Sequence, residues 1–130
     1  MDIFELVDRF SSVPCLTGDM RDELYLKKGK RFWLDRIQFA PLDVSWLKKV
    51  YGDQFLLTLY FIGKIVVKAG VSAEGKSFVW CGEKTLESSV TGEGACRIDL
   101  NKVQIGTLKI SLYAVEESVV FAANAPLAQF

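Results

Sequence analysis

The sequence predicts an all-β fold: an antiparallel β-sandwich of about seven or eight strands with a short N-terminal helix. Short apolar runs, several of them alternating with polar residues, recur from residue 31 onward, and glycine-containing turns separate them. Half of the 130 residues are hydrophobic, which is ample for one core. No linker or internal repeat interrupts the pattern. We therefore expect residues 1–130 to form a single domain.

The N-terminal segment, residues 1–16, differs from the rest because its apolar residues recur at helical spacing. Asp2 is suited to cap this helix, and Pro14 is suited to end it. We expect the helical arm to pack on the domain's own core or to dock on a partner. In the second case the protein-binding residues are the apolar ones, namely Phe4, Leu6, Val7 and Phe10.

The first clear strand signal lies at residues 32–39, which alternate in part between apolar and polar residues. This pattern predicts that Trp33, Ile37 and Phe39 share one face of the sheet. The segment 41–53 then reads as a connector that contains a helical turn.

The most apolar segment, residues 54–62, has large apolar side chains on both faces of the expected strand. Such a strand is typically central in its sheet and covered on both sides. Gly63 predicts a turn or bulge, after which residues 65–68 continue the strand. A short strand at 78–81 and a polar edge strand at 85–90 are expected to follow.

The last third of the chain alternates most regularly. The TGEG sequence at 91–94 predicts a loop, and strands are expected at 95–100, 108–114 and 119–123. The alternation predicts which side chains point into the core: Cys96, Ile98, Leu100, Leu108, Ile110, Leu112 and Ala114.

Composition narrows the chemistry. The chain has no histidine, so catalytic triads, zinc sites and pH switches that depend on this residue are excluded. The three cysteines, Cys15, Cys81 and Cys96, are far apart and form no CxxC pair. We expect three reduced thiols in or near the core and no metal or other cofactor. Reduced thiols and an N-terminus without a secretory signal pattern predict a cytoplasmic protein.

Motif searches favour a protein that is not an enzyme. The sequence contains no phosphate-binding glycine loop and no nucleophile elbow. Cys81 as a nucleophile would need a base, and Lys84 is the one nearby in sequence. Lys plus Arg and Asp plus Glu both number 16, so the formal net charge is zero. A balanced total argues against a nucleic-acid partner, although it leaves room for a local basic patch.

Four stretches resemble a C2 domain over residues 31–123: FAPLD (39–43), FLLTLYFIGK (55–64), FVWCGE (78–83) and GTLKISLYAVEE (106–117). The resemblance implies a β-sandwich. Calcium needs six to eight oxygen ligands. The corresponding loops offer only scattered carboxylates: Asp43, Asp53, Glu116 and Glu117. The chain therefore resembles the calcium-independent members, and that resemblance implies protein interaction, scaffolding or binding of anionic lipid.

Two basic runs suit an anionic surface: Lys27, Lys28, Lys30 and Arg31 in the first, and Lys48 and Lys49 in the second. The leading hypothesis is a non-enzymatic protein-interaction or scaffold module of an intracellular assembly, at the cytoskeleton or the membrane periphery, with a protein partner or self-association. The alternative is a calcium-independent peripheral membrane domain that uses these six cations. A third hypothesis is a small-ligand barrel lined by aromatic residues such as Tyr60, Phe78 and Trp80.

Overall fold

A computed structural model describes residues 24–34, 36–37, 40–72 and 78–125. The elements are β1 (Leu24–Leu26), β2 (Arg31–Leu34), β3 (Arg36–Ile37), β4 (Ala40–Pro41), α2 (Val44–Tyr51), β5 (Gln54–Ser72), β6 (Phe78–Asp99), β7 (Leu108–Ala114) and β8 (Ser118–Asn124). The expected N-terminal arm lies outside the described residues, and so do its protein-binding residues Phe4, Leu6, Val7 and Phe10.

The main sheet has six antiparallel strands built around β5. On one side of β5, β6 pairs along its whole length. On the other side, β8 pairs with the first part of β5 and β7 pairs with the second part. Beyond these two strands, β1 pairs with β8 and β2 pairs with β7. Residues 24–34 (β1 and β2) and residues 108–124 (β7 and β8) therefore form two interrupted segments that run alongside the two long strands β5 and β6. We call these four neighbouring parts of the sheet its ribbons.

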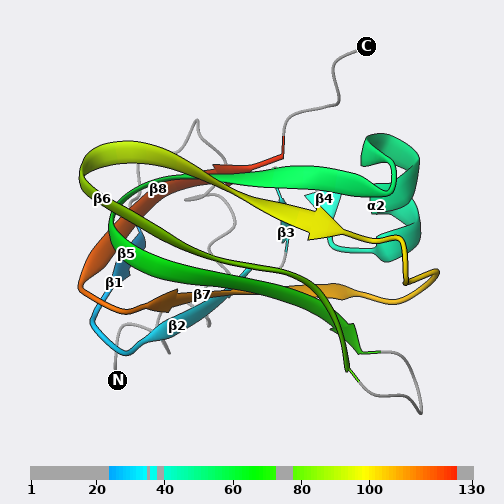
Figure 1. Ribbon diagram of the computed structural model, residues 1–130, viewed down its shortest axis with the longest axis horizontal. Helices are drawn as coiled ribbons and strands as arrows, with labels where there is room; N and C mark the ends of the chain where they lie inside the picture. The colour runs from blue at the N-terminus through cyan, green and yellow to red at the C-terminus, as the bar shows by residue number, and fades with distance from the viewer. Residues whose placement is uncertain (1–23, 35, 38–39, 73–77, 126–130) are drawn as a thin grey trace.

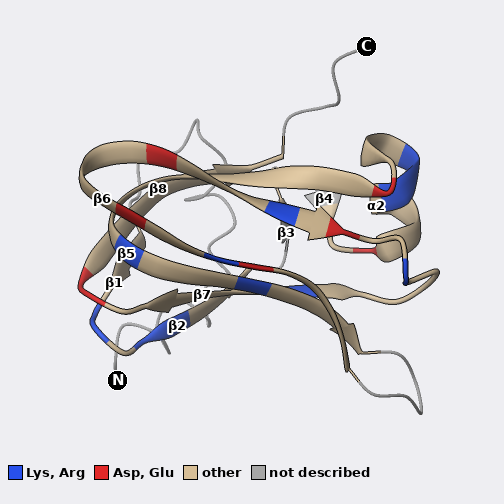
Figure 2. Ribbon diagram, in the orientation of Figure 1, with Lys and Arg blue, Asp and Glu red and all other residues tan. Residues whose placement is uncertain are grey.

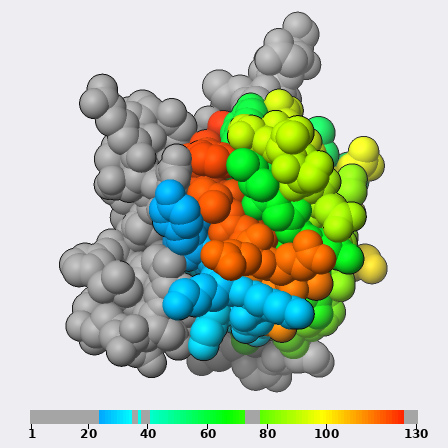
Figure 3. All heavy atoms as spheres, turned by 90° about the vertical axis from the view of Figure 1, so that its left-hand side faces the viewer, coloured from blue at the N-terminus to red at the C-terminus, as the bar shows by residue number. Residues whose placement is uncertain are grey.

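All four ribbons are interrupted at the same level, which we call the fold line (residues 27–30, 61–63, 88–92 and 115–117). The register of β5 with β6 shifts between Phe61 and Gly63, and turns separate β1 from β2 and β7 from β8. At this level the long strands double back, so the two halves of the sheet face each other (Figure 1). Viewed end-on, the four ribbons lie side by side across the fold line (Figure 3).

We call the two layers the first half-sheet (β1, β8, β5 up to residue 61 and β6 from residue 92) and the second half-sheet (β2, β7, β5 from residue 65 and β6 up to residue 88). They enclose one hydrophobic core. The inward-pointing residues predicted from alternation are all buried in it, from Cys96 to Ala114. At the open end, α2 closes the core with Val44, Leu47 and Tyr51.

The fold line depends on a close approach between β5 and β8. Gly63 has a φ of 122°, and a Cβ at this position would overlap the Ser118 side chain, at 2.6 Å from its Cβ. The Ser118 hydroxyl accepts a hydrogen bond from the Lys64 amide at 3.0 Å and donates one to the Glu116 carbonyl at 2.7 Å. Glycine is required here both for its backbone conformation and for the space it leaves.

The helix begins where its sequence predicts. The Asp43 carboxylate accepts hydrogen bonds from the Ser45 amide at 2.8 Å and the Trp46 amide at 3.2 Å, so Asp43 is the N-cap. The Ser45 hydroxyl also donates to this carboxylate, and these bonds lower the pKa of Asp43. The predicted helical turn in segment 41–53 is thus confirmed as two turns of helix.

The all-β antiparallel prediction is confirmed, but several details differ. The two layers are halves of one nearly closed sheet rather than two separate sheets. The segment 54–62 is indeed in the central strand, yet Leu56 is 49% exposed, so β5 is not covered on both sides throughout. Trp33 and Ile37 do not share a face, because the chain leaves β2 after Leu34: Trp33 is exposed and Ile37 is fully buried.

The TGEG prediction was also wrong. Residues 91–94 belong to β6, where Gly92 pairs with Phe61 and Gly94 pairs with Leu59. A Cβ on Gly94 would lie 3.0 Å from the Leu86 side chain and 3.2 Å from Phe61. These glycines therefore mark tight packing inside a strand rather than a loop.

Replacing Gly63 by alanine should destabilise the fold by about 3 kcal/mol, because the new methyl group meets Ser118 and the backbone φ is unfavourable for alanine. Gly52→Ala is the matched control, since Gly52 also has a positive φ (87°) but has no neighbour within 4 Å of the added Cβ. It should cost less than Gly63→Ala, about 1–2 kcal/mol, because only the backbone conformation is unfavourable there. Urea unfolding measures both, and equal losses would contradict the role of the close approach.

Candidate functional site

The outer surface of the second half-sheet gathers side chains from four strands. Register places Trp33, Ser111 and Lys68 opposite one another on β2, β7 and β5. In the next row Lys109 and Trp80 flank Gly70. Side chains directly opposite one another in a sheet point to the same side. We define the aromatic–cationic face by eight of the residues on this side: Arg31, Trp33, Lys68, Phe78, Trp80, Lys109, Ser111 and Tyr113. Glu83 lies directly opposite Lys68 and is on the same side of the sheet.

Three large rings of this face are open to solvent. The exposed fractions are 59% for Trp80, 41% for Trp33 and 37% for Phe78. The Phe78 and Trp80 rings meet edge to face, with centroids 4.7 Å apart. Gly70 makes room for this pair, because a Cβ there would overlap the Phe78 ring. Clustered exposed rings of this kind are typical of an interaction surface.

Cations lie beside the rings. The Arg31 guanidinium is 5.7 Å from the Trp33 ring centroid and 5.5 Å from that of Tyr113. The Lys68 ammonium is 4.5 Å from the Trp80 centroid. These are cation–π distances, so each charge is held against an aromatic surface. Lys68 also lies 3.9 Å from the exposed Glu83 carboxylate, a weak ion pair at the edge of the face.

A hollow of about 130 Å³ lies between these groups. Its wall includes all three cations of the face, Arg31, Lys68 and Lys109, and the rings of Trp33 and Trp80. Ser111 also lines it; this residue is only 3% exposed, and its hydroxyl has no hydrogen-bond partner among the described residues. A buried hydroxyl without a partner costs free energy, so it is a candidate donor to a ligand. The surrounding charge favours an anionic ligand.

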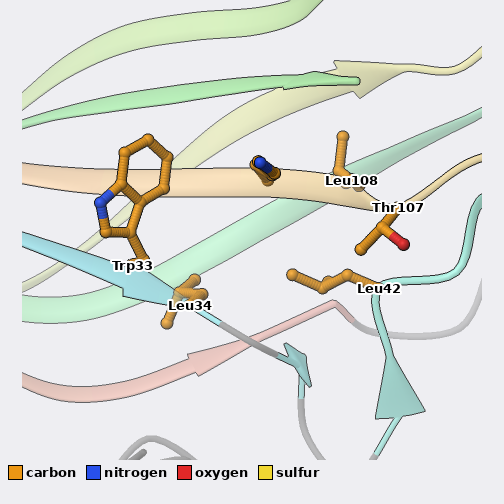
Figure 4. A pocket seen from close by; sticks show the side chains of 6 residues that line it. Trp33, Leu34, Leu42, Thr107 and Leu108 are labelled. Atoms are coloured by element: carbon orange, nitrogen blue, oxygen red, sulfur yellow. The ribbon is translucent and has the colours of Figure 1, made fainter. Parts of the chain in front are cut away.

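An apolar groove of about 410 Å³ continues from the hollow. Figure 4 labels five of the side chains that line it: Trp33 and Leu34 from β2, Leu42 before α2, Thr107 just before β7 and Leu108 at the start of β7. Lys109, also in β7, completes the lining. Trp33 and Lys109 belong to both the groove and the hollow. The aromatic–cationic face is therefore continuous with an apolar surface that could receive a flat group.

The two basic runs predicted from sequence are not brought together. Lys27 and Lys28 are exposed in the turn at the fold line, whereas Lys48 and Lys49 lie on α2 at the opposite end of the molecule (Figure 2). Lys48 donates a hydrogen bond to the Val103 carbonyl at 2.8 Å. Of the six cations proposed for lipid binding, Arg31 is the one that belongs to the aromatic–cationic face; the others are Lys27, Lys28, Lys30, Lys48 and Lys49.

The aromatic residues proposed to line a barrel do not share an interior cavity. Phe78 and Trp80 point outward from the second half-sheet, and Tyr60 lies half-buried on the first half-sheet. Tyr60 does not point into the core, because the inward-pointing residues in this part of β5 are the odd-numbered ones, such as Leu57 and Leu59.

The acidic loop at 115–117 holds Glu116 and Glu117, both exposed. Within the part of the chain that the structure describes, no group of three or more Cys, Asp or Glu residues is arranged to hold a metal ion. Cys81 and Cys96 are buried and form no disulfide, as expected for core thiols, and Cys15 lies outside the described residues.

Comparison of the sequence with protein-family models and with curated proteins gives no match. Across the described ranges, no helix is long and apolar enough to cross a membrane. The function must therefore be argued from the site itself.

Ser111→Ala should raise the free energy of unfolding by about 1 kcal/mol, because it removes a buried hydroxyl that has no partner in the unliganded face. Urea unfolding tests this. Ser118→Ala is the control, since its hydroxyl is hydrogen-bonded and its loss should destabilise by about 1–2 kcal/mol. A destabilised Ser111→Ala protein would contradict the interpretation of this hydroxyl as unsatisfied.

Stability should fall in alkaline solution. Burial raises the pKa of Cys81 and Cys96, and nearby Asp99 raises that of Cys81 further. A thiol is neutral when protonated, so above pH 9.0, its ordinary value, the unfolded chain ionises first and the folded state loses stability. Burial raises the pKa of Tyr51 too, which acts in the same direction.

Urea unfolding between about pH 7 and pH 10 measures this slope. The Cys81→Ala, Cys96→Ala double variant should lose part of the decline and keep the part due to Tyr51. An unchanged slope in the double variant would show that neither thiol contributes.

Proposed function

We propose that this chain is a non-enzymatic interaction module that binds an anionic partner through the aromatic–cationic face. One observation carries the proposal: three exposed rings and three cations share a single sheet face around one hollow. Exposed rings offer large contact area at low entropic cost, and the cations select negative charge. The hollow is lined by three cations and the Ser111 hydroxyl, while the Glu83 carboxylate lies at the edge of the face in an ion pair with Lys68; this set supports binding rather than catalysis.

The charge of the face differs from that of the whole chain. Arg31, Lys68 and Lys109 come from three different strands, and the Glu83 carboxylate lies 3.9 Å from Lys68. The local excess is positive although the formal net charge is zero. A local excess of this kind attracts an anionic partner within about a Debye length, roughly 8–10 Å at moderate salt.

We further propose that the module belongs to a larger intracellular assembly, at the cytoskeleton or the membrane periphery. The apolar spacing of the N-terminal segment supports this part, because Phe4, Leu6, Val7 and Phe10 suit a second contact with a partner protein. The resemblance to calcium-independent C2 domains is compatible with such a role, and it stays a prediction.

A second candidate is calcium-independent binding to an anionic membrane. The observation that favours it is the exposure of Lys27 and Lys28 on the turn at one tip of the molecule. Each such lysine contributes roughly 1 kcal/mol near an anionic surface. Flotation with phosphatidylserine vesicles tests this candidate. If the membrane binds the turn, the Lys27→Glu, Lys28→Glu variant should abolish flotation. If the membrane binds the aromatic–cationic face instead, the Arg31→Glu, Lys109→Glu variant should abolish it.

Heparin chromatography tests the face as a polyanion site. The Arg31→Glu, Lys109→Glu variant should elute at clearly lower salt than the unchanged protein, because two attractive charges become repulsive beside the hollow. The control, Lys49→Glu, Lys102→Glu, makes the same change of net charge at exposed positions outside the face. Equal shifts for both variants would mean that heparin responds to total charge, and the face would lose its support.

A further inference from the structure

The hollow and its flanking rings narrow the chemistry of the anionic partner. We propose that the partner is a single-stranded nucleic acid, with one phosphate in the hollow against Ser111 and bases stacked at either side on the surfaces of the rings that Arg31 and Lys68 leave exposed. This inference rests on the proposed function, since it specifies the partner of the same face.

The hollow suits one phosphate group. About 130 Å³ is the space of roughly four water molecules, enough for a compact tetrahedral anion. Phosphate oxygens are acceptors only, and Arg31, Lys68, Lys109 and the Ser111 hydroxyl are the donors that line this space. The bound phosphate would give the Ser111 hydroxyl the partner that it lacks.

The rings lie on both sides of that position. Trp33 is on β2, and Phe78 and Trp80 are on β6, with β7 and β5 between them. Three strand spacings separate β2 from β6, or about 14 Å, with the hollow between. An extended single strand that spans more than one nucleotide across the sheet would therefore bring bases to the rings at either side and a phosphate to the hollow between them.

The free base faces favour a single strand over a duplex. Paired and stacked bases in a duplex hide the surfaces that exposed tryptophans would contact, whereas single strands stack freely on aromatic side chains. The groove beside Trp33, which is 41% exposed, offers space for one such base. A lipid headgroup would use the cations and leave the aromatic surface unused, and an acidic peptide would need apolar side chains of its own to cover the rings.

The balanced composition does not oppose this inference. Arg31, Lys68 and Lys109 are far apart in the sequence and meet only through strand pairing. The sequence argument against nucleic acid applied to total charge, whereas single-strand binding depends on a local positive groove with stacking platforms.

Fluorescence anisotropy with a labelled oligothymidine of about twelve nucleotides tests the inference. The ligand control is an abasic strand of equal length, which keeps the phosphates and removes the bases. The 130-residue chain should bind oligothymidine at least tenfold more tightly than the abasic strand. An oligouridine of equal length shows whether RNA binds as well as DNA.

The protein variants separate stacking from charge. Trp33→Ala and Trp80→Ala should each weaken oligothymidine binding about tenfold and leave abasic binding nearly unchanged. Ser111→Ala should weaken both ligands by a similar factor of about three to ten, because it removes a phosphate contact. Trp46→Ala, on α2 outside the face, is the matched control and should bind like the unchanged protein.

The outcomes are distinct. Equal affinity for oligothymidine and the abasic strand, with no effect of the tryptophan variants, would overturn the nucleic-acid inference. The proposed function would still be supported if heparin binding depended on the face. Tighter face-dependent binding to an acidic peptide or to phosphatidylserine vesicles would also overturn it. If the unchanged protein binds neither heparin nor oligothymidine, both proposals are overturned.

Discussion

The contact between Gly63 and Ser118 is the constraint on which the rest of the structure depends. It lets β5 bend by bringing its backbone against β8, and the Ser118 hydroxyl binds backbone groups of both ribbons at the bend. Because β6, β7 and β8 all pair with β5, a bend in this strand is passed to its neighbours. A single sheet can thus enclose a core that two separate sheets would otherwise need to form.

Because the sheet folds back on itself, the bend also determines which side chains share the outer surface. Each half-sheet turns one face to the core and leaves the other to solvent, so polar and aromatic residues at alternate positions reach the outside together. On the second half-sheet this brings Trp33, Lys68 and Trp80 into one surface although they are distant in sequence. Gly70 completes the arrangement by leaving room for the Phe78 ring, so two glycines serve the bend and the site in different ways.

The alternation of apolar and polar residues along the sequence predicted much of the fold and little of the candidate site. The inward positions of residues 95–114 were correct because a period of two needs only local information. The TGEG segment was misassigned because glycine signals either a turn or tight packing, and only tertiary contacts distinguish the two. The same limit explains why the site was not predicted. Lys109 and Ser111 alternate with the predicted inward residues, but their proximity to Arg31 and Lys68 depends on strand register, which one sequence does not specify. The two basic runs are clusters along the sequence, but they lie at opposite ends of the molecule (Figure 2).

Amide chemical-shift mapping with the oligothymidine tests most directly the central claim that the bent sheet presents one binding face. The account predicts that the large shifts lie at residues 31–33, 66–70, 78–83 and 109–113, on four strands joined only by their pairing. Residues on the outer side of the first half-sheet, such as Leu56 and Arg97, and those of α2 should move little. Shifts centred on α2 or on the first half-sheet, with the second half-sheet unchanged, would contradict the account.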